Sequence, residues 1–309
     1  MNYLNYGIIE KEFPWIFEKQ QQAIISPDVD GILCGLLMSN YLEWEIVGFY
    51  DGKMLCQTKN ISIKDCIFLD IEIFRKEIRS CGHHMLLYNK NEVPDNWGNF
   101  NKSINPNNLR NFDALHNFQK KYPLATIHFL LCCLKEILNK EIKFLNTTTV
   151  PLLYVDGTFK NLLNYPENCN EWLMFLKAKK QDSPIYPIFE IFSRQKLKDI
   201  IHLLQSIFEK FDNIKINKRR GDKILLEKIN NIPLSFQKYY PLFELLGEYT
   251  GWEFKKEKWN LEEFKIIKLE KKIENSLTGK NFIEIIEKNP ISWAITANKR
   301  MEYTLGNFG

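Results

Sequence analysis

The sequence predicts an α/β protein in which a domain built on a parallel sheet precedes a smaller, mostly helical or α+β domain. Short apolar runs rich in Ile, Val, Phe and Tyr are bounded by turn residues, as buried parallel strands are. A stretch of helical length separates the first two runs, and helical periodicity dominates from about residue 106. At 309 residues and 45% hydrophobic content, the chain is long enough for two domains of the usual size, about 100 to 200 residues each.

The first part of the chain alternates strand-like and helix-like segments. The expected strands are "AIIS" (23–26), "EIVGFY" (45–50), "CIFLD" (66–70) and "MLLYN" (85–89). The segment "GILCGLLMSNYLEW" (31–44) has the length and apolar spacing of a helix. A strand, a helix and a second apolar strand in succession indicate a parallel crossover unit.

The middle of the chain is helical, with one predicted return to the sheet. Residues 108–140 have helical periodicity that is interrupted at Pro123, whereas "VPLLYVDGT" (150–158) is strand-like. A polar breaker, "KAKKQDSP" (177–184), then precedes an amphipathic helix predicted at 195–211. We therefore expect a parallel-sheet domain at 1–185 and a smaller second domain at 186–309, which could bind a substrate or a partner.

Charge and cysteine usage narrow the class of protein. The 42 basic and 38 acidic residues leave a net charge of +4, too small to indicate a nucleic-acid binder by itself. Seven cysteines without a CxxC pair, mostly inside apolar runs, are typical of reduced, buried thiols. The N-terminus lacks the basic flank of a signal peptide, and no window is apolar enough for a membrane span. We expect a cytoplasmic protein without membrane association.

Polar side chains gather where the predicted strands end. They are Asp28, Asp30, Asp70, His83, His84 and Asp156. Ligands bind at the carboxyl ends of strands in open α/β sheets, so these residues are expected at one rim. Carboxylates crowded together repel one another, and divalent cations relieve that repulsion. Oxygen and imidazole donors together suit Mn²⁺ better than Mg²⁺ or a thiolate-ligated Zn²⁺. A two-metal site hydrolysing a phosphoester is the implied chemistry.

Three of these segments resemble a known family. "SPDVDG", "FLDIE" and "GHHM" are similar to the first three motifs of the DHH phosphoesterase superfamily, which includes the RecJ exonucleases, nanoRNA and cyclic-dinucleotide phosphodiesterases and manganese pyrophosphatases. "INPNNLR" with "KYPLATIHFLLCCL" resembles the segment that follows the third motif in RecJ-type members, and "LLYVDGT" resembles the fourth motif. The likeness covers about residues 22–160 and leaves the C-terminal part without a counterpart.

The resemblance implies a role for each residue. Asp28, Asp30, Asp70, His83 and Asp156 would ligate Mn²⁺ (or Mg²⁺), with two ions per chain. His84 would contact the scissile phosphate and, with Asp30 near both ions, carry the catalysis.

Three departures weaken the match. Gly82 stands where the family has Asp, so a second carboxylate that orients ligands is missing, and Gly82→Asp would be expected to raise metal affinity or rate. Ile24 replaces the histidine of the pyrophosphatases, and no Gly-Gly pair is present for the glycine-rich loop that most members carry.

The C-terminal part interleaves basic and aromatic residues. Lys218, Arg219 and Arg220 in "KINKRRGDK" and the rings of residues 252–272 could contact a single-stranded nucleic acid. The alternative is a solvated surface, since the second stretch is mixed with Glu. The other histidines, His116, His128 and His202, lie on helical patterns and are expected to be core residues.

Two functions of different classes follow. The first is a metal-dependent phosphodiesterase or exonuclease-like hydrolase acting on single-stranded or short nucleic acid or a small nucleotide. The second is a catalytically silent DHH-like module that binds a nucleotide or protein partner. A phosphatase of the haloacid-dehalogenase type is weaker, because position 154 is Tyr where that motif needs a nucleophilic Asp.

Overall fold

The computed structural model describes residues 3–194, 196–214, 221–229, 233–261 and 263–308. The predicted nucleic-acid contacts Lys218, Arg219 and Arg220 lie outside the described residues.

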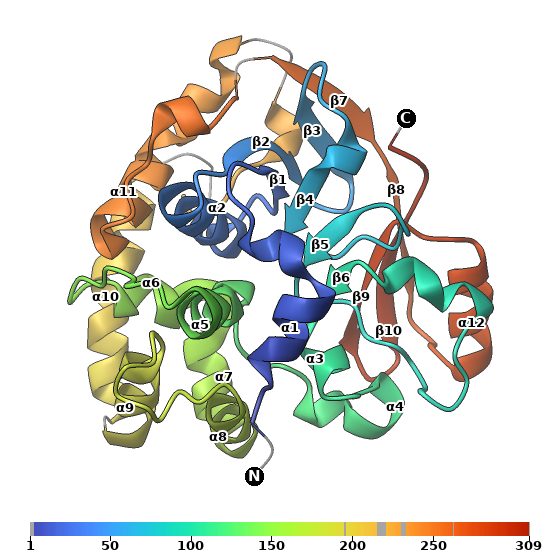
Figure 1. Cartoon of the computed structure of the whole chain (residues 1–309), viewed down its shortest axis with the longest axis horizontal. Helices are drawn as coiled ribbons and strands as arrows, with labels where there is room; N and C mark the ends of the chain where they lie inside the picture. The colour runs from blue at the N-terminus through green and yellow to red at the C-terminus, as the bar shows by residue number, and fades with distance from the viewer. Residues whose placement is uncertain (1–2, 195, 215–220, 230–232, 262, 309) are drawn as a thin grey trace.

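A seven-stranded sheet forms the centre of the molecule (Figure 1). Its strands are β1 (Gln22–Ile25), β2 (Glu45–Tyr50), β3 (Met54–Thr58), β4 (Cys66–Leu69), β5 (Arg79–Cys81), β6 (Ser103–Ile104) and β7 (Phe264–Lys268). The order across the sheet is β6-β5-β4-β1-β2-β3-β7. All neighbours from β6 to β2 pair parallel, whereas β3 pairs antiparallel with both β2 and β7. The predicted α/β class with a mostly parallel sheet is therefore confirmed.

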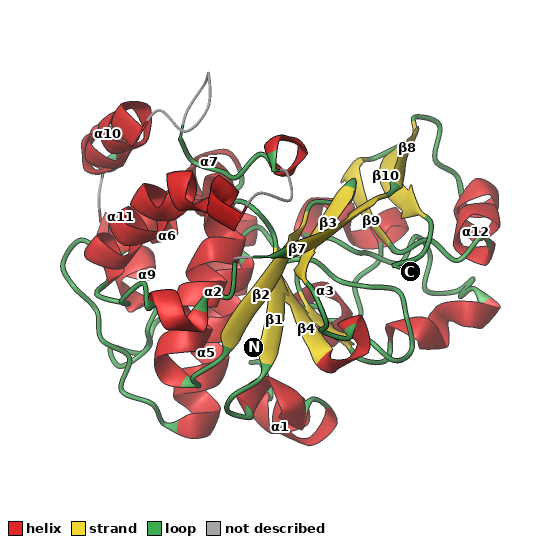
Figure 2. Ribbon diagram, turned by 90° about the horizontal axis from the view of Figure 1, so that it is seen from above, coloured by secondary structure: helices red, strands yellow, loops and turns green. Residues whose placement is uncertain are grey.

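A second sheet is small and antiparallel. It consists of β8 (Glu270–Glu274), β10 (Arg300–Leu305) and β9 (Ser292–Ala297), in that spatial order. Figure 2 shows this sheet and α12 on one side of the main sheet, and the helices α2, α5, α6, α10 and α11 on the other. Hydrogen bonds join the two sheets, from Thr304 Oγ1 to the Gly52 carbonyl (2.6 Å) and between the hydroxyls of Tyr50 and Ser292 (2.8 Å).

Helices make up most of the remaining structure. The α-helices are α1 (Tyr6–Glu12), α2 (Val29–Tyr41), α3 (Pro106–Leu109), α4 (Ala114–Asn117), α5 (Thr126–Leu138), α6 (Thr149–Tyr154), α7 (Thr158–Asn164), α8 (Pro166–Phe175), α9 (Tyr186–Arg194), α10 (Leu197–Ile214), α11 (Tyr240–Thr250) and α12 (Gly279–Glu287). The short 3-10 helices are η1 (Pro14–Phe17), η2 (Ile63–Asp65), η3 (Asp95–Phe100), η4 (Phe118–Lys120), η5 (Val155–Gly157), η6 (Leu226–Lys228), η7 (Pro233–Tyr239) and η8 (Lys256–Lys258).

Helix α2 follows β1 directly and packs tightly against it. Its sequence is apolar on nearly every side, as in a helix buried between a sheet and other helices. Asp28 caps its N-terminus by accepting a hydrogen bond from the Gly31 N–H (3.3 Å). A Cβ atom at Gly31 would lie 2.2 Å from the Ser26 carbonyl oxygen, so only glycine permits this approach of helix to strand. The turn between β1 and α2 is thereby held in place.

Two strand predictions are wrong. Residues 85–89 form an irregular segment, and the strand lies earlier, at β5. The Met85 N–H bonds the Glu72 side chain and the Met85 carbonyl accepts from Asn105, so this backbone is not available to a sheet ladder. Residues 150–158 are helical rather than extended, because a short run that is apolar throughout has no periodicity to distinguish helix from strand.

The division of the chain near residue 185 is not confirmed and stays a prediction. The largest apolar cluster contains residues on both sides of that position, such as Leu153 and Phe243. Strand β7, at 264–268, extends the main sheet by pairing with β3. The separate small sheet begins only at residue 270.

The seven cysteines are buried and unpaired, as predicted. Among the described helices, none has the length and apolar character needed to cross a membrane.

Candidate metal centre

The predicted rim lies where the strand order of the main sheet reverses. From β1 the chain runs to β2 on one side, while β4 returns on the other side of β1. Such a switch point is where loops diverge and leave room for a ligand. Asp28 follows β1 and Asp70 follows β4, and the Ser26 hydroxyl lies 2.8 Å from Asp28 Oδ1 and 2.5 Å from Asp70 Oδ2. The ends of the two central strands therefore meet as expected.

Four side chains converge beside this point and could hold a metal ion. They are Asp70, His83, His84 and Asp156, called here the Asp–His cluster. One potential ligand atom from each lies within 4.8 Å of those of the other three. His83 Nε2 is 3.2 Å from Asp156 Oδ2, and His84 Nε2 is 3.6 Å from Asp70 Oδ1. The two imidazole rings lie 4.1 Å apart, measured between their centroids.

The segments that deliver these residues differ from the predicted ones. His83 and His84 follow the carboxyl end of β5, rather than preceding a strand at 85–89. Asp156 sits at the kink between α6 and α7, with φ of 52°, and Asp70 has φ of 64°. Both are left-handed conformations, which non-glycine residues adopt at some energetic cost and which recur at functional sites.

Electrostatic coupling is strong inside the cluster. Burial alone would lower the pKa of His84, but the nearby Asp70 carboxylate raises it to about 10. Burial alone would likewise raise the pKa of Asp70, and the attraction of His84 instead holds it below its usual value. Without a cation, the pair is therefore charged, with Asp70 ionised and His84 protonated.

The pKa values of Asp28 and Asp30 are raised, whereas that of Asp70 is lowered. Burial, followed by repulsion from Asp70 and Asp156, raises the pKa of Asp28 to about 7. The same causes raise the pKa of Asp30 well above its usual value. The predicted crowding of carboxylates at one rim is thus present in the structure.

Asp30 nevertheless has a different environment from the cluster. It is 1% exposed, and its two oxygens accept hydrogen bonds from the Thr126 N–H (2.7 Å) and the Ile127 N–H (2.9 Å). These bonds fasten the start of α5 to α2. Neither Asp30 nor Asp28 belongs to the four-residue group.

Thr126 is a site residue that sequence reasoning missed. Its hydroxyl donates to Asp70 Oδ1 (2.7 Å) and lies 2.9 Å from His83 Nδ1. It therefore orients a carboxylate and an imidazole from two different strands. A threonine at the start of a helix has no feature that marks it as such from sequence alone.

A second missed residue is Glu72, which holds the backbone of the loop that carries His83 and His84, called here the histidine loop. Its fully buried carboxylate accepts hydrogen bonds from the N–H groups of His84 (3.2 Å) and Met85 (3.1 Å) and from the amide of Asn105. Asn107 donates to the His83 carbonyl (3.3 Å). The asparagines of the "INPNN" segment thus hold the backbone of the loop.

The remaining histidines separate into three cases. His128 is fully buried, with Nδ1 accepting from the Ala125 N–H and Nε2 3.0 Å from the Leu152 carbonyl, so its predicted core role is confirmed. The core prediction is wrong for His116, which is exposed and pairs with Asp113 (2.8 Å), and for His202, which is exposed on α10.

The rings of the predicted stacking surface at 252–272 are mostly buried. Trp252, Trp259 and Phe264 are at most 2% exposed, because they pack in the main core. Bases of a single strand therefore have no access to these three rings. The fourth, Phe254, is half-buried against Phe243 and Trp259.

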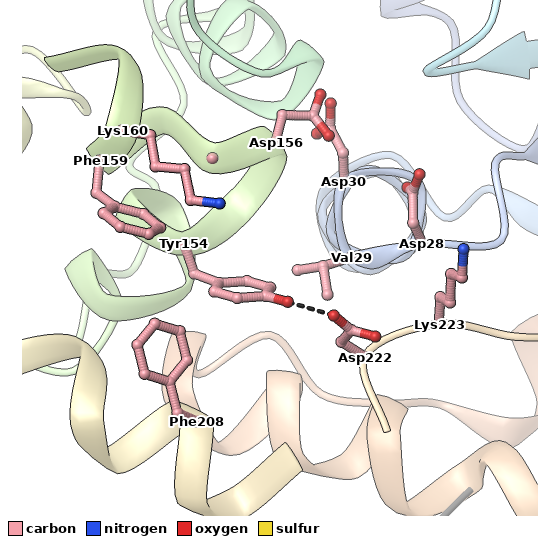
Figure 3. A pocket seen from close by; sticks show the side chains of 11 residues that line it. Asp28, Val29, Asp30, Tyr154, Asp156, Phe159, Lys160, Phe208, Asp222 and Lys223 are labelled. Atoms are coloured by element: carbon pink, nitrogen blue, oxygen red, sulfur yellow. Dashed lines mark hydrogen bonds between the residues drawn. The ribbon is translucent and has the colours of Figure 1, made fainter. Parts of the chain in front are cut away.

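Two cavities open on either side of Asp28. One, of about 490 Å³, reaches Asp156 and Asp30 and is shown in Figure 3. The other, of about 460 Å³, reaches Asp70 and His84 and extends to the small sheet. Together they give the cluster access to solvent from two directions.

The chain matches no family model, and comparisons with curated proteins and with solved structures gave no match.

Proposed function

We propose that this protein is a metal-dependent phosphodiesterase of the DHH type, acting on short or single-stranded nucleic acid or on a small nucleotide. The observation that carries the proposal is the convergence of Asp70, His83, His84 and Asp156 from three separate segments at the switch point of the sheet. Asp70 is buried, the two histidines are partly buried and Asp156 is exposed, so a cation could reach the cluster and would offset the repulsion between its two carboxylates.

The donor set fits a divalent transition metal. Two carboxylate oxygens and two imidazole nitrogens are a mixture suited to Mn²⁺, whereas Mg²⁺ prefers oxygen alone. When bound, such an ion supplies an activated water and neutralises charge on a phosphoryl oxygen.

The surrounding residues hold the donors in place. The Ser26 and Thr126 hydroxyls contact the Asp70 carboxylate, and Thr126 also fixes the His83 ring. Such outer contacts set the orientation of ligands and typically account for about 10- to 100-fold in metal affinity or activity.

The number of ions follows from how the carboxylates are used. The Asp–His cluster offers donors to one ion. A second ion would have to recruit Asp28 and Asp30, which hold the starts of α2 and α5. We propose one tightly bound ion, and a second, weaker one on the side of Asp28.

A catalytically silent module that binds a nucleotide or protein partner is the second candidate. It is favoured by one observation, the engagement of both Asp30 oxygens by backbone N–H groups of α5. In that function, Asp30 would be purely structural.

The test is Mn²⁺ titration by calorimetry, together with hydrolysis of bis(p-nitrophenyl) phosphate. We expect binding and Mn²⁺-dependent turnover by the wild type, and a loss of at least 100-fold in turnover for His84→Asn. His116→Asn is the matched control, because His116 also pairs with an aspartate but lies outside the cluster. Turnover that survives chelation would contradict the metal mechanism. Mn²⁺ or nucleotide binding without turnover would favour the silent module.

A further inference from the structure

The cavity drawn in Figure 3 lies beside Asp156 and has an aromatic wall. Tyr154 at the end of α6, Phe159 in α7 and Phe208 in α10 form this wall, and the cavity is called here the aromatic pocket. Phe208 lies 5.9 Å from Tyr154 and 6.4 Å from Phe159, between ring centroids. Its volume of about 490 Å³ falls within the roughly 300 to 1,000 Å³ of small-molecule sites.

Lys160 brings a positive charge to the same pocket. It follows Phe159 in α7, is exposed, and has its ammonium 5.8 Å from the centre of the Phe159 ring. Among the residues that the structure describes, no carboxylate forms an ion pair with Lys160. A phosphate oxygen is a natural partner for such a cation at the edge of an aromatic site.

The cavity on the other side of Asp28 reaches the small sheet. It is called here the charged pocket and is lined by Lys53, Lys271 and Glu302, from the β2–β3 turn and the small sheet. Both cavities carry charge, since Asp30, Asp156 and Asp222 also line the aromatic pocket, where Asp222 accepts a hydrogen bond from the Tyr154 hydroxyl. Asp28 and Lys223 line both pockets. Three of the four cluster residues divide between them, with Asp156 in the aromatic pocket and Asp70 and His84 in the charged one. A phosphate at the cluster would therefore have one substituent on each side.

We propose that the aromatic pocket binds the nucleoside on one side of the scissile phosphate, with its base against the aromatic wall and Lys160 near the phosphate. The rest of the substrate then extends into the charged pocket. A nucleoside monophosphate would occupy the aromatic pocket alone, and pyrophosphate has no base to place there, so the preferred substrate is a nucleotide diester, whose second substituent reaches the charged pocket. This inference rests on the proposed function and adds the pocket in which the nucleoside binds.

The test compares a dinucleotide with two analogues, each lacking one of its bases. Stacking of one base contributes about 1 to 3 kcal/mol, or roughly 5- to 150-fold. We expect Phe159→Leu and Lys160→Ala to raise KM for the dinucleotide at least tenfold, and Phe159→Leu to have a smaller effect on the analogue that lacks the base in this pocket. Lys198→Ala, an exposed lysine of α10 outside the pocket, is the matched control.

The outcomes separate the two proposals. Equal effects of Phe159→Leu on the dinucleotide and on both analogues, or no effect on any, would overturn the aromatic pocket as a base site while leaving the hydrolase intact. If the wild type hydrolyses none of the three, the proposed function fails, and calorimetry with the dinucleotide then decides about the pocket. Binding that weakens at least tenfold in Phe159→Leu supports the pocket, and absence of binding by the wild type overturns it.

Discussion

The carboxylate of Glu72 occupies the space that a side chain at residue 82 would need. A Cβ atom built on Gly82 would lie 2.7 Å from Glu72 Oε2 and 3.1 Å from the Ile71 amide nitrogen. Glu72 has no room to move away, because it is fully buried and accepts hydrogen bonds from the N–H groups of His84 and Met85. The carboxylate missing at position 82 is thus matched by one that reaches the histidine loop from residue 72.

Gly82→Asp is therefore expected to weaken the site, contrary to the expectation from the sequence motif. The new side chain would displace Glu72 and strand buried N–H groups, at a cost of about 1 to 3 kcal/mol for each unsatisfied group. We expect a lower free energy of unfolding in urea and at least tenfold weaker Mn²⁺ binding by calorimetry.

Gly98→Ala serves as the control for that change, since the nearest atom to its new Cβ would be 3.8 Å away. Tighter Mn²⁺ binding in the single Gly82→Asp variant would show that Glu72 does not fill this role.

Asp30→Asn is expected to destabilise the fold. The amide would place its NH₂ group against the N–H of Thr126 or Ile127, which the carboxylate now satisfies from both oxygens. The unmatched buried donors cost about 1 to 3 kcal/mol, which urea unfolding without metal can measure. Equal stability of this variant and the wild type would imply that the start of α5 finds other acceptors. A loss of hydrolysis in Asp30→Asn is then interpretable only alongside its stability.

Asp156→Asn is the cleaner probe of the metal. Asp156 is exposed and its carboxylate contacts His83 Nε2, so the amide keeps the shape of the site while removing a charged ligand. We expect Mn²⁺ to raise the Tm of the wild type, since an ion at 100 times its Kd adds about 2.7 kcal/mol to the free energy of unfolding. The variant should require at least tenfold more Mn²⁺ for the same rise. Asp182→Asn, an exposed residue outside the site, should behave like the wild type. An unchanged Mn²⁺ response in Asp156→Asn would remove this residue from the set of ligands.

Sequence patterns predicted the elements whose signals are local. Short apolar runs predicted β1 and β4, which precede Asp28 and Asp70. The polar turn at Asp28 marks the capped start of α2. Strand β5 escaped detection because "RSC" is short and partly polar, and it is held in place by pairing with β4. Strand β7 pairs with β3 across some 200 residues, a contact that no local pattern encodes.

The same contrast between local and long-range signals applies to the residues of the candidate site. Asp156 reaches the cluster from a helix kink, although its segment was expected to be a strand, because the packing of α6 rather than local periodicity decides its position. Glu72 lies two residues after Asp70, and that spacing alone could have indicated a second carboxylate near the site. Its partnership with Gly82 depends on the distance between two loops, which becomes visible only in the folded chain.

The lowered pKa of the buried His128 makes the free energy of unfolding depend on pH in the absence of metal. Burial lowers its pKa from 6.5 to about 4 in the folded protein. Above pH 6.5 the imidazole is neutral in both states, and its hydrogen bonds to Ala125 and Leu152 contribute fully. As the pH falls from 6.5 toward 4, the unfolded chain takes up a proton that the folded protein excludes, so the free energy of unfolding decreases. At about 1.4 kcal/mol per pH unit, His128 accounts for a loss of about 3 kcal/mol.

Urea unfolding at several pH values between 4 and 7 measures this loss, and His128→Gln isolates it. The glutamine is neutral throughout, so the variant should start from a lower stability at pH 7, because the fit and the hydrogen bonds of the imidazole are lost, and decline less steeply. His116→Gln is the matched control, since His116 is exposed and its replacement leaves the buried imidazole in place. Parallel curves for His128→Gln and the wild type would mean that other groups, such as the carboxylates beside the Asp–His cluster, govern the acid side of the stability profile.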